Sequence, residues 1–146
     1  MKKIIIAMAL LLGGNLMAQS ADDILGKWWN EEKDGQVEIY KVGTEYRGRV
    51  VYVKFNTNPD GTSPKNDNLN PEPALRKRVI EGLTILRDLR FNSSKKEWSG
   101  GEIYDTKSGN TYECFCKLQD DGTLFFKGHI KLSRMLGRST TWTRVE

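Results

Sequence analysis

Apolar and polar residues alternate along most of the chain beyond residue 24, which is the period of a β-strand with one buried face. The alternating segments are short, closely spaced and separated by turn residues, so they favour an all-β antiparallel barrel or sandwich. Closing the sheet removes its exposed edges, and we therefore expect an eight-stranded antiparallel barrel. The predicted strands cover residues 25–31, 36–42, 45–55, 83–91, 97–105, 111–119, 123–131 and 138–145.

The first predicted hairpin is joined by Gly43-Thr44, a two-residue turn that begins with glycine. Counting back from this turn places Val37 opposite Val50 on one face of the sheet. On the other face it places Glu38 opposite Arg49. A direct cross-strand pair of opposite charges stabilises this register by roughly 0.2–1 kcal/mol.

The residues 120–122, Asp-Asp-Gly, predict a second hairpin with a three-residue loop, in which the glycine takes the left-handed position. This loop length pairs Cys116 with Phe126 on the inner face. Cys114 then lies opposite Gly128. A loop shorter by one residue would mix the two faces, which is strongly disfavoured when one face is buried.

Within residues 97–105, the pair Gly100-Gly101 predicts a β-bulge, because glycine relieves the kink that the extra residue introduces. With this bulge, Trp98 and Ile103 both face inward despite their odd spacing. Glu102 then faces outward, where its carboxylate stays hydrated.

One long stretch, residues 56–80, breaks the alternation. It contains all four prolines of the chain, Pro59, Pro64, Pro71 and Pro73. Proline removes a backbone donor and fixes φ, so a central strand is excluded here. The stretch ends in residues 73–78, a charged run that is compatible with a short helix capped by Asn70. We therefore expect one long ordered loop with a short helix, and we expect it to carry a working surface.

Residues 1–18 have the pattern of a secretory signal peptide. Lys2 and Lys3 precede an apolar run over residues 4–12, and the small residue Ala18 marks the expected cleavage site. The run of nine residues is too short to span a bilayer, which takes about 20. We expect a periplasmic or secreted protein, a single barrel domain over residues 19–146, and no transmembrane segment in the mature chain.

The charge of the chain argues against nucleic acid as a partner. The formal net charge is +4, and removing Lys2 and Lys3 leaves +2 (4 − 2). Proteins that bind nucleic acid carry a concentrated basic face, and so small an excess does not provide one.

The sequence offers no catalytic set. His129 is the only histidine, and the predicted register places it on the hydrated outer face between Lys127 and Lys131. A Ser-His-Asp arrangement would require burying it, and no nucleophile motif is present. Hydrolysis by two carboxylates stays open, although no pair stands out.

Cys114 and Cys116 lie two residues apart on one strand, about 6.6 Å from each other with parallel side chains. This geometry is poor for a disulfide, so we expect two buried thiols. With His129 they make three potential zinc ligands, whereas a structural zinc site takes about four. We therefore expect neither a metal nor a cofactor.

Two features of the chain ends resemble the lipocalin superfamily. Gly26-Lys27-Trp28 stands near the expected mature start, and Arg144 lies in the last predicted strand. In lipocalins a Gly-x-Trp motif opens the first strand and a late arginine packs over the tryptophan. The resemblance implies a structural signature that also includes Trp98 and Trp142.

Longer blocks are similar to a bacterial secreted family known as domain of unknown function 2147. They are Asp67–Arg78, Gly82-Leu83, Trp98–Asp105, Gly109–Tyr112 and Thr141–Val145. The resemblance covers nearly the whole chain beyond the signal peptide. It implies an exported lipocalin-like barrel, with no activity common to the family.

The predicted ligand-binding residues are Asp67, Asn70, Arg76, Arg78, Tyr104, Asp105 and Tyr112. Guanidinium groups suit an anionic ligand, and residues two apart on a helix do not share a face. We therefore expect one of the two arginines to pair with Asp67 or Asp105, and the other to face solvent or ligand. Two structural alternatives stay open: the polar residues only stabilise turns, and the aromatic residues only fill the barrel.

These observations favour an exported binding protein that holds a small anionic or amphipathic molecule at the barrel mouth. The alternative is a structural or interaction protein of the cell envelope, with a filled barrel and a docking loop. A cavity above about 300 Å³ would favour the first, because small-molecule sites have that scale. Neither the ligand nor the oligomeric state can be read from the sequence.

Overall fold

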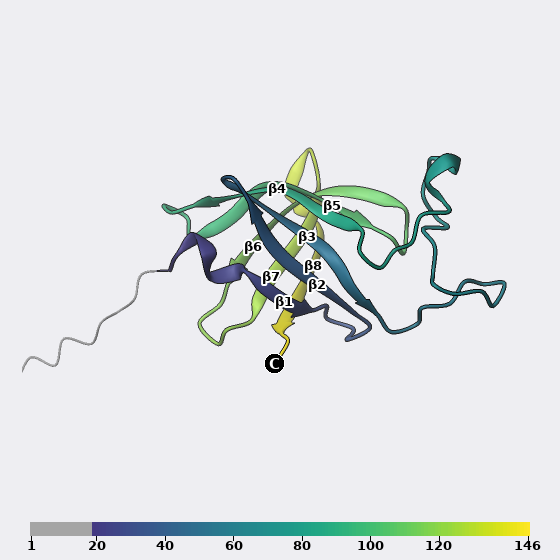
Figure 1. Ribbon diagram of the computed structural model, residues 1–146. Coiled ribbons are helices and arrows are strands. Elements are labelled where there is room, and N and C mark those ends of the chain that lie inside the picture. Colours follow the sequence, from purple (N-terminus) through teal and green to yellow (C-terminus); the bar gives the residue numbers. More distant parts are fainter. Residues whose placement is uncertain (1–18) are drawn as a thin grey trace, which may run out of the picture.

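The structure, a computed structural model, describes residues 19–146, and the predicted signal peptide lies outside the described residues. It is a closed antiparallel barrel in which each strand pairs with the next and the last pairs with the first, so the predicted fold is confirmed (Figure 1). The strands are β1 (Gly26–Trp29), β2 (Gly35–Val42), β3 (Glu45–Val53), β4 (Thr84–Asn92), β5 (Glu97–Asp105), β6 (Asn110–Leu118), β7 (Leu124–Ile130) and β8 (Ser133–Arg144).

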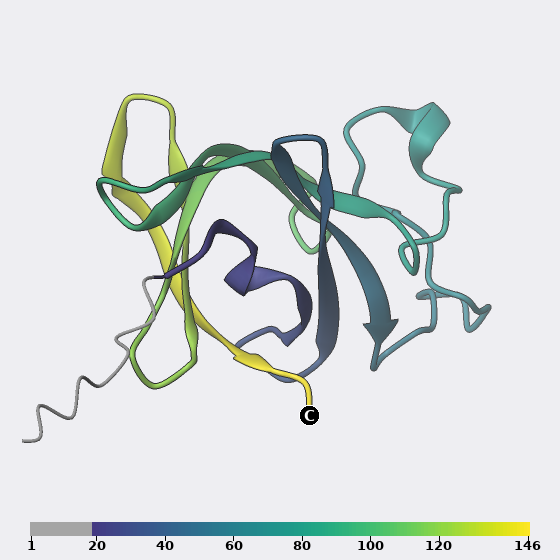
Figure 2. The same ribbon diagram turned by 60° about the vertical axis from the view of Figure 1, so that its left-hand side comes forward.

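Successive connections alternate between the two ends of the barrel, because each strand runs antiparallel to the one before it. The end with the β2–β3 turn is closed by the 3-10 helix η1 (Ala21–Ile24), which crosses the opening in Figure 2. Ser20 and Asp23 form a capping box at its start. Trp98 Nε1 donates a hydrogen bond to Ala21 O at 2.9 Å. The opposite end forms the mouth.

The predicted register of the first hairpin is confirmed. Val37 pairs with Val50 on the inner face. On the outer face Glu38 pairs with Arg49, whose Nε donates a hydrogen bond to the Glu38 carboxylate at 2.9 Å. The alternation of the two strands and their turn type were therefore enough to set the pairing.

The second hairpin and the predicted bulge are confirmed as well. Cys116 pairs with Phe126 across β6 and β7. Cys116 also pairs with Trp98 of β5, and the register then shifts so that Gly101 pairs with Cys114. Both cysteines are buried and free, as expected.

Trp28 joins the first and last strands at the closed end. It is fully buried, and its Nε1 donates a hydrogen bond to Ile24 O at 2.9 Å. The guanidinium of Arg144 stacks over the indole, 4.2 Å from the ring centroid. Arg144 also donates hydrogen bonds to the carbonyl oxygens of Leu25 and Asp23, at 2.8 and 2.7 Å. The late arginine thus packs over the early tryptophan, as the lipocalin resemblance implied.

The last strand starts at Ser133, earlier than the predicted start at residue 138. Ile130 pairs with Ser133 through a tight turn, and residues 134–136 then form a wide bulge. Gly137 allows the bend, because a Cβ there would lie 2.0 Å from Gly128 O. The prediction was wrong here because a bulge of this width hides the strand period.

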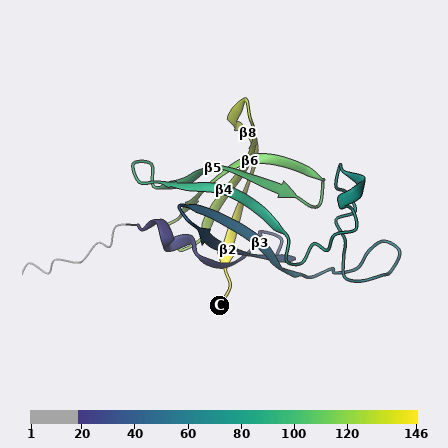
Figure 3. The ribbon, with the colours of Figure 1, turned by 45° about the horizontal axis from the view of Figure 1, so that its top comes forward.

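The long loop between β3 and β4, residues 54–83, extends away from the barrel wall (Figures 1 and 3). It buries little apolar surface and is held mainly by polar contacts. The side-chain Nδ2 of Asn58, for example, lies 2.8–3.2 Å from three acceptors, Thr62 Oγ1, Pro64 O and Asn66 Oδ1.

The predicted short helix of the loop is only a single 3-10 turn, η2 (Pro73–Leu75). Asn70 does not cap it, so that expectation was wrong. The N-cap residue is Glu72, whose backbone N–H donates a hydrogen bond to Asn70 Oδ1 at 2.9 Å. An isolated bridge between Asn66 and Val79 extends the chain after the turn, and this long-range pairing ends the helical run.

His129 also departs from the prediction, because it is not hydrated. It lies on the outer face of β7, yet only 6% of its surface is exposed. Phe115 packs beside it, with ring centroids 5.9 Å apart. Its Nδ1 lies 2.9 Å from Ile130 O. Alternation assigns a residue to a face of the sheet, but it does not show whether other side chains cover that face.

Candidate functional site

The inward side chains at the mouth end do not fill the barrel but leave a cavity of about 590 Å³. This volume lies within the range of about 300–1,000 Å³ that is typical of small-molecule sites. The apolar wall includes Val37, Val50, Ile85, Ile103, Phe126 and Trp142. Phe126 and Trp142 stack face to face with centroids 4.4 Å apart. The depth of the cavity is thus suited to an apolar group.

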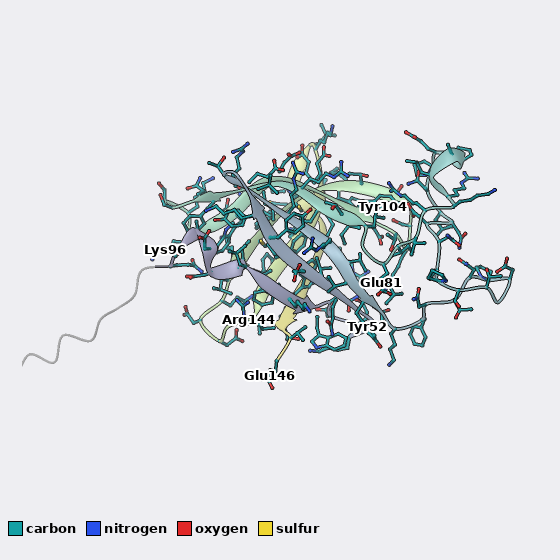
Figure 4. All side chains as sticks on the ribbon, in the orientation of Figure 1. Tyr52, Glu81, Lys96, Tyr104, Arg144 and Glu146 are labelled. Atoms are coloured by element: carbon teal, nitrogen blue, oxygen red, sulfur yellow. The ribbon has the colours of Figure 1, made fainter. Side chains whose placement is uncertain are left out.

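The rim of the cavity is polar and charged. It includes Tyr52, Tyr104, Tyr112, Glu32, Asp34, Asp105, Lys65, Lys107 and Arg138. Tyr52 and Tyr104 lie toward this end of the barrel and Lys96 lies at the opposite end (Figure 4). An apolar interior under a polar rim matches a molecule with both kinds of surface.

Two ion pairs cross the rim. Lys107 Nζ lies 2.8 Å from Asp34 Oδ2 and joins the β5–β6 turn to the β1–β2 turn. Arg138 Nη2 lies 2.9 Å from Glu32 Oε1 and joins β8 to the same β1–β2 turn. The two basic side chains are the more exposed partners, and such pairs contribute about 0–1 kcal/mol, so an anionic ligand can take over either cation at little cost.

Four of the predicted site residues meet around one buried carboxylate at the base of the long loop. Asp67 Oδ2 accepts hydrogen bonds from Arg78 Nε and Asn70 Nδ2, both at 2.9 Å. Asp67 Oδ1 accepts one from the hydroxyl of Tyr104 at 2.7 Å. The carboxylate therefore attaches the loop to β5. The expected pairing of one loop arginine with Asp67 is confirmed for Arg78.

The predicted set divides into two groups in the structure. Tyr104, Asp105 and Tyr112 line the cavity. The loop residues Asp67, Asn70, Arg76 and Arg78 are not among the residues that line it. Arg76 is exposed and its Nε donates a hydrogen bond to Asn70 O at 2.8 Å. As contacts to a ligand, both groups stay predictions.

The match to a known family follows the barrel from end to end. A family model described as uncharacterized protein conserved in bacteria, DUF2147, matches residues 26–144. The chain belongs to this family. The matched range begins at Gly26 of β1 and ends at Arg144 of β8, and so includes every strand. No curated protein matches the sequence.

A solved structure places this DUF2147 barrel among lipocalin-like folds. The chain is similar to protein HP1028 from the human pathogen Helicobacter pylori, with a TM-score of 0.71 and 26% sequence identity. The similarity covers 84% of this chain and 83% of HP1028. HP1028 is described as belonging to the lipocalin family. The lipocalin-like fold predicted for the DUF2147 chain is therefore confirmed.

The cysteines of this DUF2147 protein are not set up as nucleophiles. Burial raises the pKa of Cys114 and Cys116 far above the usual value for a thiol. The nearby carboxylates of Glu102 and Glu113 raise the pKa of Cys114 further. Because the thiolate is the reactive form, both groups stay protonated and inert at neutral pH.

Residues 19–146 contain no group of three His, Cys, Asp or Glu side chains placed to bind a metal ion. None of the helices in that range has the length and hydropathy needed to cross a membrane.

Burial and the hydrogen bond to Asp67 raise the pKa of Tyr104 to about 12. The folded state therefore holds this proton more tightly than the unfolded state, in which the phenol has a pKa of about 10. The resulting stability is fully present below pH 10 and is lost as the pH rises from about 10 to 12.

We expect an ultraviolet absorbance titration of the folded protein to show a phenol with a pKa of about 12, and Tyr104→Phe to remove that component. The variant should also retain more of its stability between pH 10 and 12, relative to its own value at neutral pH. If Tyr104→Phe instead removed a phenol that titrates near pH 10, the assigned environment of Tyr104 would be contradicted.

Most of the cavity wall had no signal of its own in the sequence. The predicted register placed Val37 and Val50 on one inner face, but it did not show whether opposite walls meet or leave space. Lys107 lines the cavity from the β5–β6 connection, where alternation carries no information. Phe55 also lines it, from just beyond the end of β3 at Val53, although the predicted strand reached residue 55. Only the mutual arrangement of the strands and loops makes these residues neighbours.

Proposed function

We propose that this protein binds a small amphipathic molecule, with the apolar part in the barrel and the polar or anionic part at the rim. The observation that carries the proposal is the cavity of about 590 Å³, which is apolar inside and charged at its opening. Burial of an apolar group there would contribute about 25 cal/mol for each Å² removed from water. The alternative of a filled barrel that acts only as an interaction protein is disfavoured by the same cavity.

Charges at the rim support an anionic head group. Lys65, Lys107 and Arg138 line the opening together with three acidic residues. The ion pair between Lys107 and Asp34 is exposed on the lysine side, so the ammonium can turn to a ligand without leaving a buried charge unpaired. A carboxylate, sulfate or phosphate group on the ligand would thus find a cation that is already in place.

The most direct test fills the cavity from a glycine. Gly128 lines the cavity, and a Cβ there would lie 3.6 Å from the nearest atom, Tyr112 Cβ, which is an ordinary contact. Gly128→Leu should therefore fold and place its side chain in the cavity. We expect it to weaken binding of anilinonaphthalene sulfonate, an amphipathic anion, by at least about tenfold in a fluorescence titration.

The matched control adds the same side chain outside the barrel. Ser139 is exposed and pairs with Lys127 on the outer face of β8, so Ser139→Leu should bind the probe like the unmodified protein. Equal affinity in the Gly128 and Ser139 variants would overturn the cavity as the binding site. Mass spectrometry of protein purified from its own host would then identify any bound molecule.

We also propose that the protein works in the periplasm or outside the cell. The support is the pattern of residues 1–18, a basic start followed by a short apolar run and a small residue. Cell fractionation combined with the mass of the purified chain tests this. The expected result is an exported chain that begins near Gln19, and an intact chain in the cytoplasm would refute it.

A further inference from the structure

The tip of the β7–β8 hairpin exposes an unusual amount of apolar surface. The exposed fractions are 92% for Leu132, 84% for Met135, 59% for Leu136 and 42% for Ile130. Isolated exposed apolar residues are normal on a protein surface, but a contiguous group marks an interaction site. We define these four residues as the apolar tip.

The apolar tip stands at the mouth of the barrel. The connections β1–β2, β3–β4, β5–β6 and β7–β8 all lie at the mouth end, because the strands alternate in direction. Ile130 and Leu136 line the cavity itself. The hairpin projects beyond its neighbouring strands in Figures 1 and 3, whereas the long loop leaves the barrel at a different side. Apolar surface is therefore continuous from the cavity to the tip.

The tip is held in place by contacts at its base. Arg134, in the bulge, donates hydrogen bonds to both carboxylate oxygens of Glu97, each at 3.1 Å. Its guanidinium also stacks 3.7 Å from the centroid of the Phe115 ring. Lys127 Nζ donates a hydrogen bond to Met135 O at 3.3 Å. The bulge is thus fixed with its apolar side chains outward, rather than being a mobile loop that could fold them away.

Basic side chains of the β7–β8 hairpin itself flank the apolar tip. Residues 122–145 contain no Asp or Glu, and the basic residues near the tip are Lys127, Lys131, Arg134 and Arg138. Arg134 and Arg138 are paired with acidic residues of other segments. Lys127 and Lys131 form no ion pair with any residue in the described range 19–146. Glu102 and Glu113 lie on the outer face below the tip, beside His129.

We propose that the apolar tip docks on an anionic lipid bilayer, with Leu132 and Met135 entering the interface and the lysines contacting lipid head groups. Apolar side chains beside basic ones are the pattern of interfacial membrane binding. Docking brings the cavity wall at Ile130 and Leu136 next to the bilayer, so that a ligand could pass between membrane and cavity. That transfer rests on the proposed function, whereas docking itself does not.

A second copy of the chain fits the tip less well than a bilayer does. A two-fold contact between tips would bring the same basic residues together, which charge repulsion disfavours. A stable protein interface also buries about 800 Å² on each partner, far more than a hairpin tip of four side chains offers. An anionic membrane supplies the complementary charge and has no minimum contact area.

The test is sedimentation of the purified protein with vesicles made of phosphatidylethanolamine and phosphatidylglycerol. We expect the protein to bind these vesicles and to bind phosphatidylcholine vesicles much more weakly. The double variant Leu132→Gln, Met135→Gln should reduce binding to the anionic vesicles by at least about tenfold. Lys131→Gln should reduce it by about fivefold, as expected for one basic residue at an anionic surface.

The matched control is Leu69→Gln, which removes an exposed leucine from the long loop. It should bind vesicles like the unmodified protein, and all variants should keep their melting temperature because the changed side chains are exposed. Absence of vesicle binding, or equal binding by the tip and Leu69 variants, would overturn the proposal. The proposal would also be overturned if the unmodified protein formed a dimer in solution and the tip variant were a monomer, because the tip would then contact a second copy.

Binding of anilinonaphthalene sulfonate in solution separates this proposal from the proposed function. The tip variant should bind the probe with unchanged affinity while its vesicle binding falls. Gly128→Leu should show the reverse. Failure of the cavity as a ligand site would therefore leave the vesicle result intact, and failure of docking would leave the probe titration intact.

Discussion

Trp28→Ala should lower the free energy of unfolding by about 3–5 kcal/mol, the usual cost of removing a buried tryptophan. The indole is fully buried at the closed end of the barrel and donates a hydrogen bond to Ile24 O. Its loss leaves a cavity and removes the aromatic surface under Arg144. Urea unfolding followed by circular dichroism measures this effect.

The control for Trp28 keeps an aromatic ring without the indole N–H. Trp28→Phe should cost clearly less than the alanine variant, because most of the buried surface and the ring under the guanidinium remain. Arg144→Gln should lower the free energy of unfolding by still less than Trp28→Phe, since the arginine side chain is exposed at the barrel edge. If Trp28→Ala unfolds at the same urea concentration as the unmodified protein, Trp28 does not hold the first and last strands together.

Asp67→Ala should lower the free energy of loop opening by about 2–4 kcal/mol. The change leaves the hydroxyl of Tyr104 and the side chains of Asn70 and Arg78 without their acceptor. Arg78 is partly exposed and can regain water, which keeps the expected effect below that of a fully buried pair. Faster hydrogen exchange at the Ile80 amide, which bonds to Lys65 O inside the loop, would report the opening.

Glu72→Ala provides the comparison within the same loop, because Glu72 is exposed and its side chain does not cap η2. It should change loop opening by less than about 0.5 kcal/mol. Equal exchange rates in the two variants would show that the Asp67 carboxylate is not the attachment point. Titration with anilinonaphthalene sulfonate adds a separate readout: unchanged affinity in Asp67→Ala would assign Asp67 a structural role only.

The loop residues illustrate how far a site can be inferred from sequence. The pairing of a loop arginine with Asp67 was expected from charge alone. The contact between Asp67 and Tyr104 joins residues 37 positions apart and required the fold. The helix predicted over residues 73–78 shrank to η2 because the pairing of Asn66 with Val79 overrides local helix preference. Local propensity therefore located the loop but not its internal contacts.

The hairpin registers, the bulge at Gly100-Gly101 and the closed barrel were determined by the sequence itself. These features follow from turn types and from the two-residue period of side chains, which are local properties of the chain. Because one face of the sheet is buried, only one register keeps the apolar side chains of each strand out of water. The end residues Gly26, Trp28 and Arg144 added the lipocalin resemblance, which the structure bears out.

Only the tertiary structure decided that the barrel is hollow, that His129 is covered and that the apolar tip stands at the mouth. An eight-stranded barrel is just wide enough either to be filled by side chains or to hold one small ligand. Which of the two occurs depends on the combined volume of the inward-facing side chains of all eight strands. It also depends on how the bulged strand β8 pairs with β7. No single segment contains that information, because it is a property of the closed ring.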